Sequence, residues 1–261
     1  MRILFVVDGR SPIALNWIEY FTKGEHEVHL ISTIACQPDL KLASIQIVPV
    51  AFSATAGETT RTGRGLRGLF PAGLRTQLRS WVGPFTLGPA TKRLQELIDE
   101  TNPDLVHAMR IPYEGMLAAA TQAEVPLMVS VWGNDFTLHA RANPFMAAAT
   151  RKTMQRAAAL HTDTKRDQRL AAEWGFDRSK PALMVPGSGG VRPEIFYPAK
   201  TEPRGLRVVN PRGLRAYVRN DVFFKAIPKV LRQLPEVRFD CPGMQGKPEA
   251  KRWVQKLGIE Q

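Results

Sequence analysis

The stretch MRILFVVDGRSP, residues 1–12, decides how the rest of the chain is interpreted. Ile3–Val7 is a continuous apolar run closed by Asp8-Gly9, which is typical of a strand buried on both faces of a parallel sheet. Apolar residues then recur at helical spacing from Ile13 to Phe21. We therefore expect a strand followed by a helix here. A signal peptide would need a longer apolar stretch and a cleavage site.

The same alternation of strand and helix patterns continues to residue 185. It predicts a doubly wound, Rossmann-like parallel α/β sheet with helices on both faces. Further strands are predicted at Val28–Ser32, Ile45–Val50, Leu105–Met109, Pro126–Trp132, Ala159–Thr162 and Ala182–Val185. Further helices are predicted at Leu74–Val82, Thr91–Thr101, Tyr113–Ala123, Phe145–Ala159 and Lys165–Trp174. Such sheets bind ligands beyond the carboxyl ends of their strands, which singles out the loops Asp8–Pro12, His107–Glu114, Trp132–Asp135 and Gly187–Val191.

A second α/β unit is predicted after the linker-like residues 197–203. Its strands are expected at Leu206–Val209 and Val237–Cys241, and its helices at Val222–Leu234 and Lys247–Leu257. We expect domains at residues 1–199 and 200–261. Two strands and two helices bury little apolar surface, so the second domain is predicted to be incomplete.

Charge and composition indicate an ordinary globular protein with anionic partners. The 261 residues include 36 Lys and Arg against 24 Asp and Glu, a net charge of +12. Residues 200–261 contain 14 basic and 6 acidic residues, and Thr59–Gln95 contains seven basic and no acidic residues. Such regions suit nucleotide phosphates, lipid head groups or nucleic acid. With only Cys36 and Cys241, and no apolar run near the 18 residues of a membrane span, we expect a reduced, cytoplasmic protein.

Several familiar motifs are absent or incomplete. Gly63–Gly68 spells GxGxxG, but Pro71 and Gly73 interrupt the helix that a dinucleotide site needs, so a basic loop is expected. Gly187–Gly190 follows a strand but lacks the GK[ST] of a P-loop, and it is equally compatible with a structural turn and a ligand-lining loop. No metal-binding spacing of His or Cys occurs, so neither a metal nor a bound cofactor is expected.

Two turns are candidates for binding phosphate. Gly9 permits close backbone approach at the first strand-to-helix turn, where helix N–H groups are free. In the second unit Arg212, Arg215 and Arg219 follow a strand, and guanidinium groups bind phosphate oxygens in a fork. Solvated surface charge is the alternative at the second turn. By position alone, His107 is more typical of a structural role than of a catalytic one.

Taken in order, these segments resemble the glycosyltransferases of family 4 (group 1), which have the GT-B architecture of two Rossmann-like domains. The matching segments are MRILFVVDGRSP, GEHEVHLIST, NPDLVHAMRIPYEG, VPLMVSVWGNDF, VPGSGGVRPEIFYP and VVNPRGLRAYVRND. The resemblance implies transfer of a sugar from a nucleotide-diphosphate sugar to a carbohydrate or lipid acceptor, usually with retention and without a metal.

The resemblance also implies site residues, although it assigns no catalytic residue. It implies donor phosphate binding by Gly9, Arg10, Arg212 and Arg219, and a cleft loop at Gly189 and Gly190. On the acceptor side it implies His107, Arg110, Glu114, Trp132 and Asp135. Many members have His where this chain has Trp132, and the usual Lys-Gly after the Arg is missing, so Arg219 is the substitute cation. The glutamate-bearing donor motif is also missing, so we expect this form to turn over poorly or not at all.

Two alternatives remain open at this point. One is a GT-B nucleotide-sugar epimerase, which needs carboxylates and His placed for proton abstraction. The other is a non-catalytic basic module that binds an anionic membrane or nucleic acid. Residues 61–82 suit peripheral contact with the inner face of a membrane, because Leu74, Leu78 and Trp81 share a helical face flanked by Arg. No nucleic-acid fold signature is evident, so no nucleic acid is expected as a partner.

Overall fold

The computed structural model describes residues 1–50, 81–186, 191, 193–201, 205–214 and 218–260. Contacts divide the chain into Met1–Val191, here unit 1, and Arg192–Gln261, here unit 2. The expected boundary between residues 199 and 200 stays a prediction. The interpretations of Gly63–Gly68, of most of Leu74–Val82, of Arg215, and of Gly189 and Gly190 lie outside the described residues.

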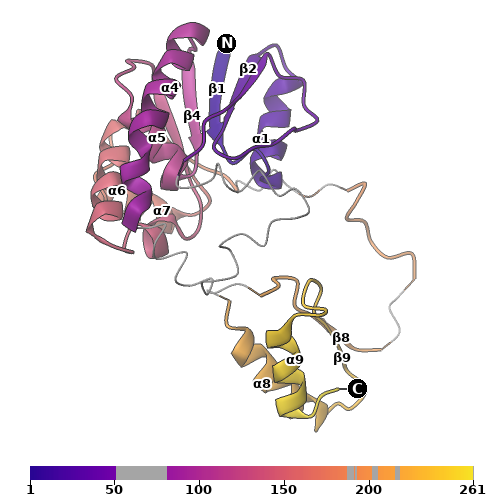
Figure 1. Ribbon diagram of the computed structural model, residues 1–261. Coiled ribbons are helices and arrows are strands. Elements are labelled where there is room, and N and C mark those ends of the chain that lie inside the picture. Colours follow the sequence, from indigo (N-terminus) through magenta and orange to yellow (C-terminus); the bar gives the residue numbers. More distant parts are fainter. Residues whose placement is uncertain (51–80, 187–190, 192, 202–204, 215–217, 261) are drawn as a thin grey trace, which may run out of the picture. The chain divides into compact units, whose positions relative to one another are not determined.

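Within its described residues, unit 1 forms a parallel sheet of seven strands, which confirms the predicted doubly wound α/β class (Figure 1). The strand order is β3-β2-β1-β4-β5-β6-β7, and each neighbouring pair is parallel. The strands are β1 Arg2–Val7, β2 Glu27–Ser32, β3 Ser44–Ile47, β4 Leu105–Met109, β5 Leu127–Val131, β6 Ala159–Thr162 and β7 Ala182–Met184.

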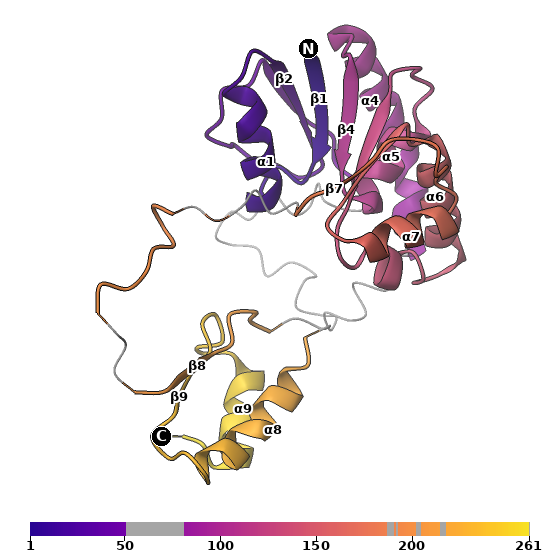
Figure 2. The same cartoon turned by 180° about the vertical axis from the view of Figure 1, so that it is seen from behind.

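Both faces of this sheet are covered, which is why β1 is apolar at nearly every position. Leu4 and Val6 pack into the larger core with α4, α5, α6 and α7, whereas Phe5 and Val7 pack into the smaller core with α1. Figure 2 shows α1 beside β1 and β2, and α6 and α7 beyond β4. The helices are α1 Pro12–Thr22, α4 Leu87–Thr101, α5 Met116–Ala120, α6 Pro144–Arg156 and α7 Lys165–Glu173.

Local signals explain where several helices begin. Ser11 caps α1 by accepting a hydrogen bond from the Ala14 N–H, and Pro12 occupies the first turn, where no N–H is needed. Asn143 and Thr164 cap α6 and α7 in the same way.

Short helical turns differ from the sequence prediction. The helix expected at Tyr113–Ala123 starts as a π-helical turn, η3 Ile111–Gly115, and its α-helical part ends at Ala120. A second π-helical turn, η4 Asp135–His139, follows β5, and a 3-10 turn, η2 Gly83–Thr86, precedes α4. The helix expected to reach Ala159 ends at Arg156, because Ala159 already pairs with Met128 in the sheet.

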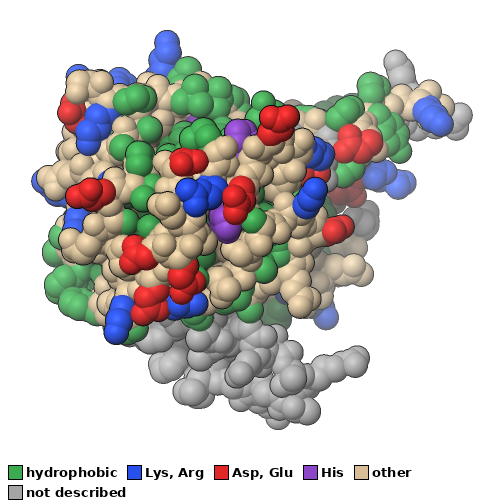
Figure 3. Space-filling model, turned by 90° about the horizontal axis from the view of Figure 1, so that it is seen from above, with side chains coloured by type: hydrophobic (Ala, Val, Ile, Leu, Met, Phe, Trp, Pro, Cys, Tyr) green, Lys and Arg blue, Asp and Glu red, His purple; other side chains and the backbone are tan. Residues whose placement is uncertain are grey.

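The order in which strands are added to the sheet changes direction between β1 and β4. β1 continues to β2 on one side, while β4 pairs with the other side of β1, with Phe5 opposite His107. In parallel α/β sheets such a switch point leaves a crevice at the carboxyl ends of the two strands, because their loops turn to opposite faces. At the opposite edge, where β1 begins, acidic and basic side chains are intermixed on the surface (Figure 3).

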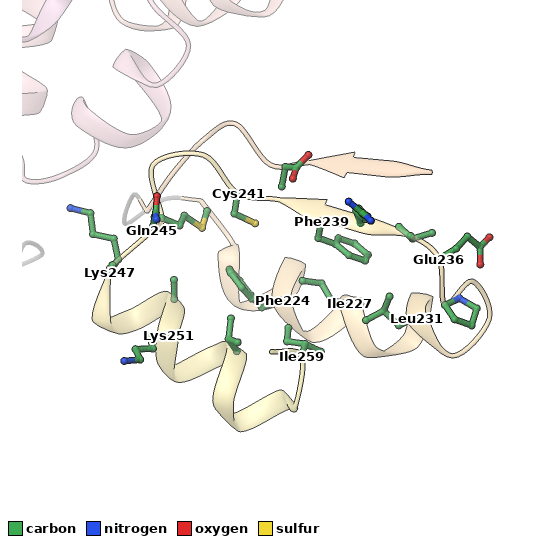
Figure 4. Close-up of a pocket in the computed structure, with 18 residues that line it drawn as sticks. Phe224, Ile227, Leu231, Glu236, Phe239, Cys241, Gln245, Lys247, Lys251 and Ile259 are labelled. Carbon is green, nitrogen blue, oxygen red and sulfur yellow. The ribbon is translucent and has the colours of Figure 1, made fainter. Parts of the chain in front are cut away.

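The described residues of unit 2 form a parallel strand pair and two helices. The elements are β8 Arg207–Val209, β9 Arg238–Asp240, α8 Asn220–Leu231 and α9 Pro248–Leu257. A hollow of about 1310 Å³ lies between the strand pair and the helices. In Figure 4 Phe224, Ile227 and Leu231 of α8 and Phe239 of β9 face this hollow. The lining is mostly apolar, so two strands leave much of the helices' apolar surface uncovered.

Candidate functional site

Asp135 joins the loops that follow β4 and β5. Its side chain has no exposed surface. The Oδ2 atom accepts hydrogen bonds from the backbone N–H groups of Ile111 and Trp132, each 3.1 Å away, and Oδ1 accepts one from Arg110 Nε at 3.3 Å. Burial raises the pKa of Asp135 and the Arg110 cation opposes that shift. Asp135 thus closes two neighbouring loops over the carboxyl edge of the sheet.

Arg110 takes an unusual backbone conformation to make this contact, with φ 144° and ψ 153°. Non-glycine residues pay about 1–3 kcal/mol for such conformations, and they persist where the surroundings fix them. Its Nη2 also donates to His139 Nε2 at 3.1 Å. Burial lowers the pKa of Arg110, but the Asp135 and Glu114 carboxylates outweigh it and hold that pKa above its ordinary value.

Glu114 lies on η3 and contacts the end of β2. Thr33 Oγ1 donates a hydrogen bond of 2.8 Å to Glu114 Oε1. Only 6% of Glu114 is exposed, and burial raises its pKa to about 7 although Arg110 acts in the opposite direction. Asp8, at the end of β1, adds to the upward shift of that pKa. The ends of β1, β2 and β4 therefore meet at one group of charged side chains.

The Gly9 turn is packed tightly against the loop after β2. The Gly9 N–H donates to Ser32 Oγ at 3.0 Å. Arg10, implied as a phosphate ligand, forms a fork with the carboxylate of Asp8, from Nε at 3.1 Å and from Nη2 at 3.2 Å. Arg10 remains exposed, so the turn offers a cation to solvent beside the N-terminus of α1.

We expect Gly9→Ala to lower the free energy of unfolding by about 1–3 kcal/mol, because overpacking of this size forces its neighbours to move. A Cβ at Gly9 would lie 2.4 Å from Cys36 Sγ and 2.8 Å from Ser32 Oγ. Gly88→Ala is the matched control, since a Cβ at Gly88 in α4 meets nothing within 4 Å. The free energy of unfolding of Gly88→Ala should rise by about 0.5–1 kcal/mol, because Ala is favoured over Gly in a helix. Urea unfolding measures both, and equal stability of the two variants would contradict the packing argument.

His107 does not join this charged group. It is 2% exposed inside β4, with its ring 5.3 Å from that of Phe5 and 6.2 Å from that of Trp17. Its Nε2 is 2.8 Å from Ser130 Oγ, and Ser130 Oγ is 2.9 Å from His161 Nδ1. Because His161 Nε2 donates to the Val185 carbonyl, Ser130 donates to His161 and His107 donates to Ser130. Burial lowers the pKa of His107 to about 3, so His107 is neutral, and this chain of hydrogen bonds ties β4, β5 and β6 together.

Trp132, also implied on the acceptor side, begins the loop that Asp135 closes. The indole is half-buried against the smaller core. Its Nε1 is buried and has no hydrogen-bond partner among the residues that the structure describes. Arg166 of α7 donates to the Gly133 carbonyl at 3.1 Å and fixes this loop from the other side.

In unit 2 the loop after β8 holds the implied donor residues. Asn210 and Asn220 are buried and bonded side chain to side chain at 3.0 Å, and Asn220 Nδ2 also donates to the Gly213 carbonyl. Arg212 is exposed on this loop. Arg219 forms a fork with Asp221, at 2.9 Å and 3.0 Å. Of the two implied cations, Arg212 has no ion pair among the described residues.

Sequence reasoning missed part of this arrangement. Thr33, His139, Asn210 and Asn220 were not predicted, and Asp8 was named only as part of its turn. Asp8, Thr33 and Asn210 each directly follow a strand, and a polar residue at the end of a strand is a signal that the sequence offers. His139 gave none, because it depends on the unpredicted turn η4.

The fold and the polar strand ends define a Rossmann-like, doubly wound α/β protein. The chain belongs to the glycosyl transferase 4-like domain family, whose profile matches residues 9–187. The match covers more than half of the chain and nearly all of unit 1. No curated protein sequence gives a significant match.

Solved structures share the fold at low identity. HepE (Alr3699) from Anabaena, in complex with UDP-glucose, is 13% identical with a TM-score of 0.62, over 100% of this chain and 67% of that chain. UDP-GlcNAc 2-epimerase from Neisseria meningitidis, bound to UDP-GlcNAc, is 11% identical with a TM-score of 0.56, over 98% and 69%. The apo form of the lipopolysaccharide outer core galactosyltransferase WaaB is 12% identical with a TM-score of 0.53, over 100% and 66%. Within the described residues, no helix is long and apolar enough to span a membrane.

Proposed function

We propose that this protein is a retaining, metal-independent glycosyltransferase that moves a sugar from a nucleoside-diphosphate sugar to a carbohydrate or lipid acceptor. The observation that carries the proposal is the group of Asp8, Thr33, Arg110, Glu114 and Asp135 at the carboxyl edge around the β1–β4 switch point, in a chain of this family. This is where parallel α/β sheets bind ligands. Similarity to structures with bound UDP-sugars supports the choice of donor.

In unit 2 we propose Arg212 and Arg219 as donor phosphate ligands. Unit 1, taken by itself, offers Gly9 and Arg10 as candidates for binding donor phosphate. Guanidinium groups and free N–H groups stabilise the negative charge that develops as a diphosphate leaves. Arg212 is the strongest candidate, because the Asn210–Asn220 pair holds its loop while the side chain stays exposed.

The donor proposal is tested by binding of UDP and UDP-glucose to the full chain, followed by tryptophan fluorescence and calorimetry. We expect Arg212→Ala to weaken UDP binding about 10- to 100-fold, as loss of a hydrogen bond between charged groups does. Arg232→Ala is the matched control, since Arg232 is an exposed arginine of the same unit at the end of α8. Absence of UDP binding, or binding of DNA that replaces it, would refute the donor proposal.

Catalysis is a separate question from binding. Radiolabelled UDP-glucose with a panel of glycosides tests whether sugar is transferred. Conversion of UDP-GlcNAc to its 2-epimer would favour the epimerase alternative.

We further propose peripheral contact with an anionic membrane through residues 61–82. Trp81, inside this range, and Phe85, just after it, are exposed, and both rings contact that of Phe145, at 5.9 Å and 4.8 Å between centroids. Aromatic rings beside basic residues suit a lipid interface.

Vesicle flotation tests this contact. We expect the full chain to bind vesicles of phosphatidylglycerol more than vesicles of phosphatidylcholine, and Trp81→Ser with Phe85→Ser to weaken that binding about tenfold. Tyr20→Ser is the matched control, since Tyr20 is an exposed aromatic residue of α1. Equal binding by both variants would contradict the role of the aromatic pair.

A further inference from the structure

A groove of about 380 Å³ lies on unit 1 where α4, α5 and α6 are neighbours (Figure 1). One wall is η2 with the start of α4, the other is α6, and α5 forms the floor. α5 packs against both walls, but it is only five residues long and three of these are alanine. Its small side chains leave the space between its two neighbours unfilled. The volume is in the range of about 300–1,000 Å³ that ligand sites occupy.

The groove is open to a ligand and mostly apolar. Leu87 on the α4 wall, Met116 and Ala119 on the floor and Ala149 on the α6 wall all line it. A Cβ built at Gly88, which also lines it, meets nothing within 4 Å. An apolar chain could therefore lie along the floor without displacing a side chain.

The polar groups of the lining leave one cation available. Thr91 Oγ1 donates to the Leu87 carbonyl at 2.8 Å, and Thr153 Oγ1 donates to the Ala149 carbonyl at 2.8 Å, so each hydroxyl proton is used within its own helix. Lys152 is exposed at the rim and forms no ion pair with any described residue. No acidic residue lines the groove in the described part of the chain. The lining is thus complementary to a single negative charge.

The helices that form the two walls carry positive charge in the same region. α6 contains Arg151, Lys152 and Arg156 and no acidic residue. The first nine residues of α4, Leu87–Gln95, contain Lys92 and Arg93 and no acidic residue. An anion at the rim therefore meets attraction from both sides and no nearby carboxylate.

The exposed aromatic rings lie at one end of this groove. Pro84 lines the groove and Phe85 follows it, and Phe145 precedes Ala149 by about one turn of α6. Lys152 comes seven residues after Phe145, which is about 10 Å along a helix that rises 1.5 Å per residue. The groove thus has an aromatic end and a cationic end, as a molecule with an apolar chain and an anionic head requires.

We propose that this groove binds one acyl chain of an anionic phospholipid taken from the membrane, with the lipid phosphate beside Lys152. This inference rests on the proposed membrane contact and adds a binding site to it. Each methylene that the groove removes from water favours binding, and the lysine attracts the phosphate. Stable attachment to a membrane usually takes two such signals, and here the exposed rings and the bound lipid supply them. The lipid is held and is not chemically changed.

The first test is calorimetric titration of the full chain with dihexanoyl phosphatidylglycerol, kept below the concentration at which it forms micelles. Monomeric lipid reaches the groove without a membrane. We expect saturable binding, about fivefold tighter than that of dihexanoyl phosphatidylcholine, because one lysine contributes about that factor toward an anionic lipid. Lys152→Gln should remove the preference, and Lys165→Gln, at an exposed lysine of α7, should keep it. No binding, or equal binding of the two lipids by the wild type, would overturn the proposal.

The second test fills the groove. We expect Ala149→Phe to weaken binding of dihexanoyl phosphatidylglycerol about 10- to 100-fold, because several methylenes lose their place in the groove. Ala148→Phe is the matched control, since Ala148 is the neighbouring residue of α6, is exposed and does not line the groove. Thr91→Leu narrows the groove from the opposite wall, so the result does not depend on one variant. Urea unfolding shows that the variants are folded, and wild-type binding by both filled variants would contradict the site.

Vesicle flotation separates the groove from the membrane contact on which it rests. A wild type that floats with phosphatidylglycerol vesicles but does not bind the monomeric lipid would overturn the groove and leave the membrane contact intact. Binding of monomeric lipid without flotation would overturn the membrane contact, and with it the membrane as the source of the lipid. Binding of UDP is measured separately, so neither outcome decides the transferase proposal.

Discussion

Replacing Asp135 by Ala is expected to lower the free energy of unfolding of unit 1 by about 2–4 kcal/mol, because each buried donor left without an acceptor costs about 1–3 kcal/mol. The change leaves the N–H groups of Ile111 and Trp132 without an acceptor and leaves Arg110 without its counter-charge. It also removes what holds Arg110 in its unusual backbone conformation. Urea unfolding followed by circular dichroism measures the loss.

Asp39→Ala is the control for this prediction, because Asp39 is an exposed carboxylate in the loop between β2 and β3. It should change stability by less than about 0.5 kcal/mol. Asp135→Asn separates the two contributions: its amide oxygen can still accept from the two N–H groups, while its charge is gone. We expect an intermediate loss. A loss below about 1 kcal/mol for Asp135→Ala would show that the two loops are held by other contacts.

Replacing Glu114 by Gln is expected to stabilise the protein at alkaline pH. Its folded pKa of about 7 lies above the ordinary value of 4.5, so the folded state binds the proton more tightly than the unfolded state. Between these two values the wild type therefore loses stability as the pH rises, and above pH 7 the loss is complete. It amounts to about 3 kcal/mol at about 1.4 kcal/mol per pKa unit. Gln does not ionise, so the variant avoids this loss.

The measurement is the difference in unfolding free energy between Glu114→Gln and the wild type at pH 4.5 and pH 8. The difference should grow by up to about 3 kcal/mol toward the higher pH. His107 changes the stability of the wild type in the opposite direction to Glu114. Its pKa in the folded protein lies below the ordinary 6.5, so the free energy of unfolding falls as the pH drops below 6.5. Subtracting the wild type cancels that contribution, because both proteins contain His107. A difference that stays constant with pH would contradict the raised pKa of Glu114.

Most of the fold of unit 1 was predictable because its strands are local apolar runs. RILFVV at β1 and LVHAM at β4 are buried on both faces, and each ends at a polar residue or a turn. The turns η3 and η4 were not predictable, since an apolar spacing does not distinguish a π-helical turn from the start of an α-helix. The alternation of strands and helices predicted a doubly wound parallel sheet, but it did not predict the order of the strands.

The site was predictable in outline, by strand ends, and less so in detail. Arg110, Glu114 and Asp135 were expected at one edge of the sheet, and the structure brings them together. His107 precedes Arg110 by only a few residues, yet its side chain lies among Phe5 and Trp17, because two residues of strand still follow it. The partners Thr33 and His139 come from elements distant in sequence, so no local pattern could pair them with Glu114 and Arg110.

The pairing of β1 with β4 has a consequence for how the chain is made. Phe5 finds its partner His107 only after about a hundred further residues have left the ribosome, so the central ladder closes late. Until then β1 presents an unpaired apolar edge, the kind of surface on which nascent chains aggregate. We therefore expect β1 to be the strand of unit 1 that waits longest for its second neighbour.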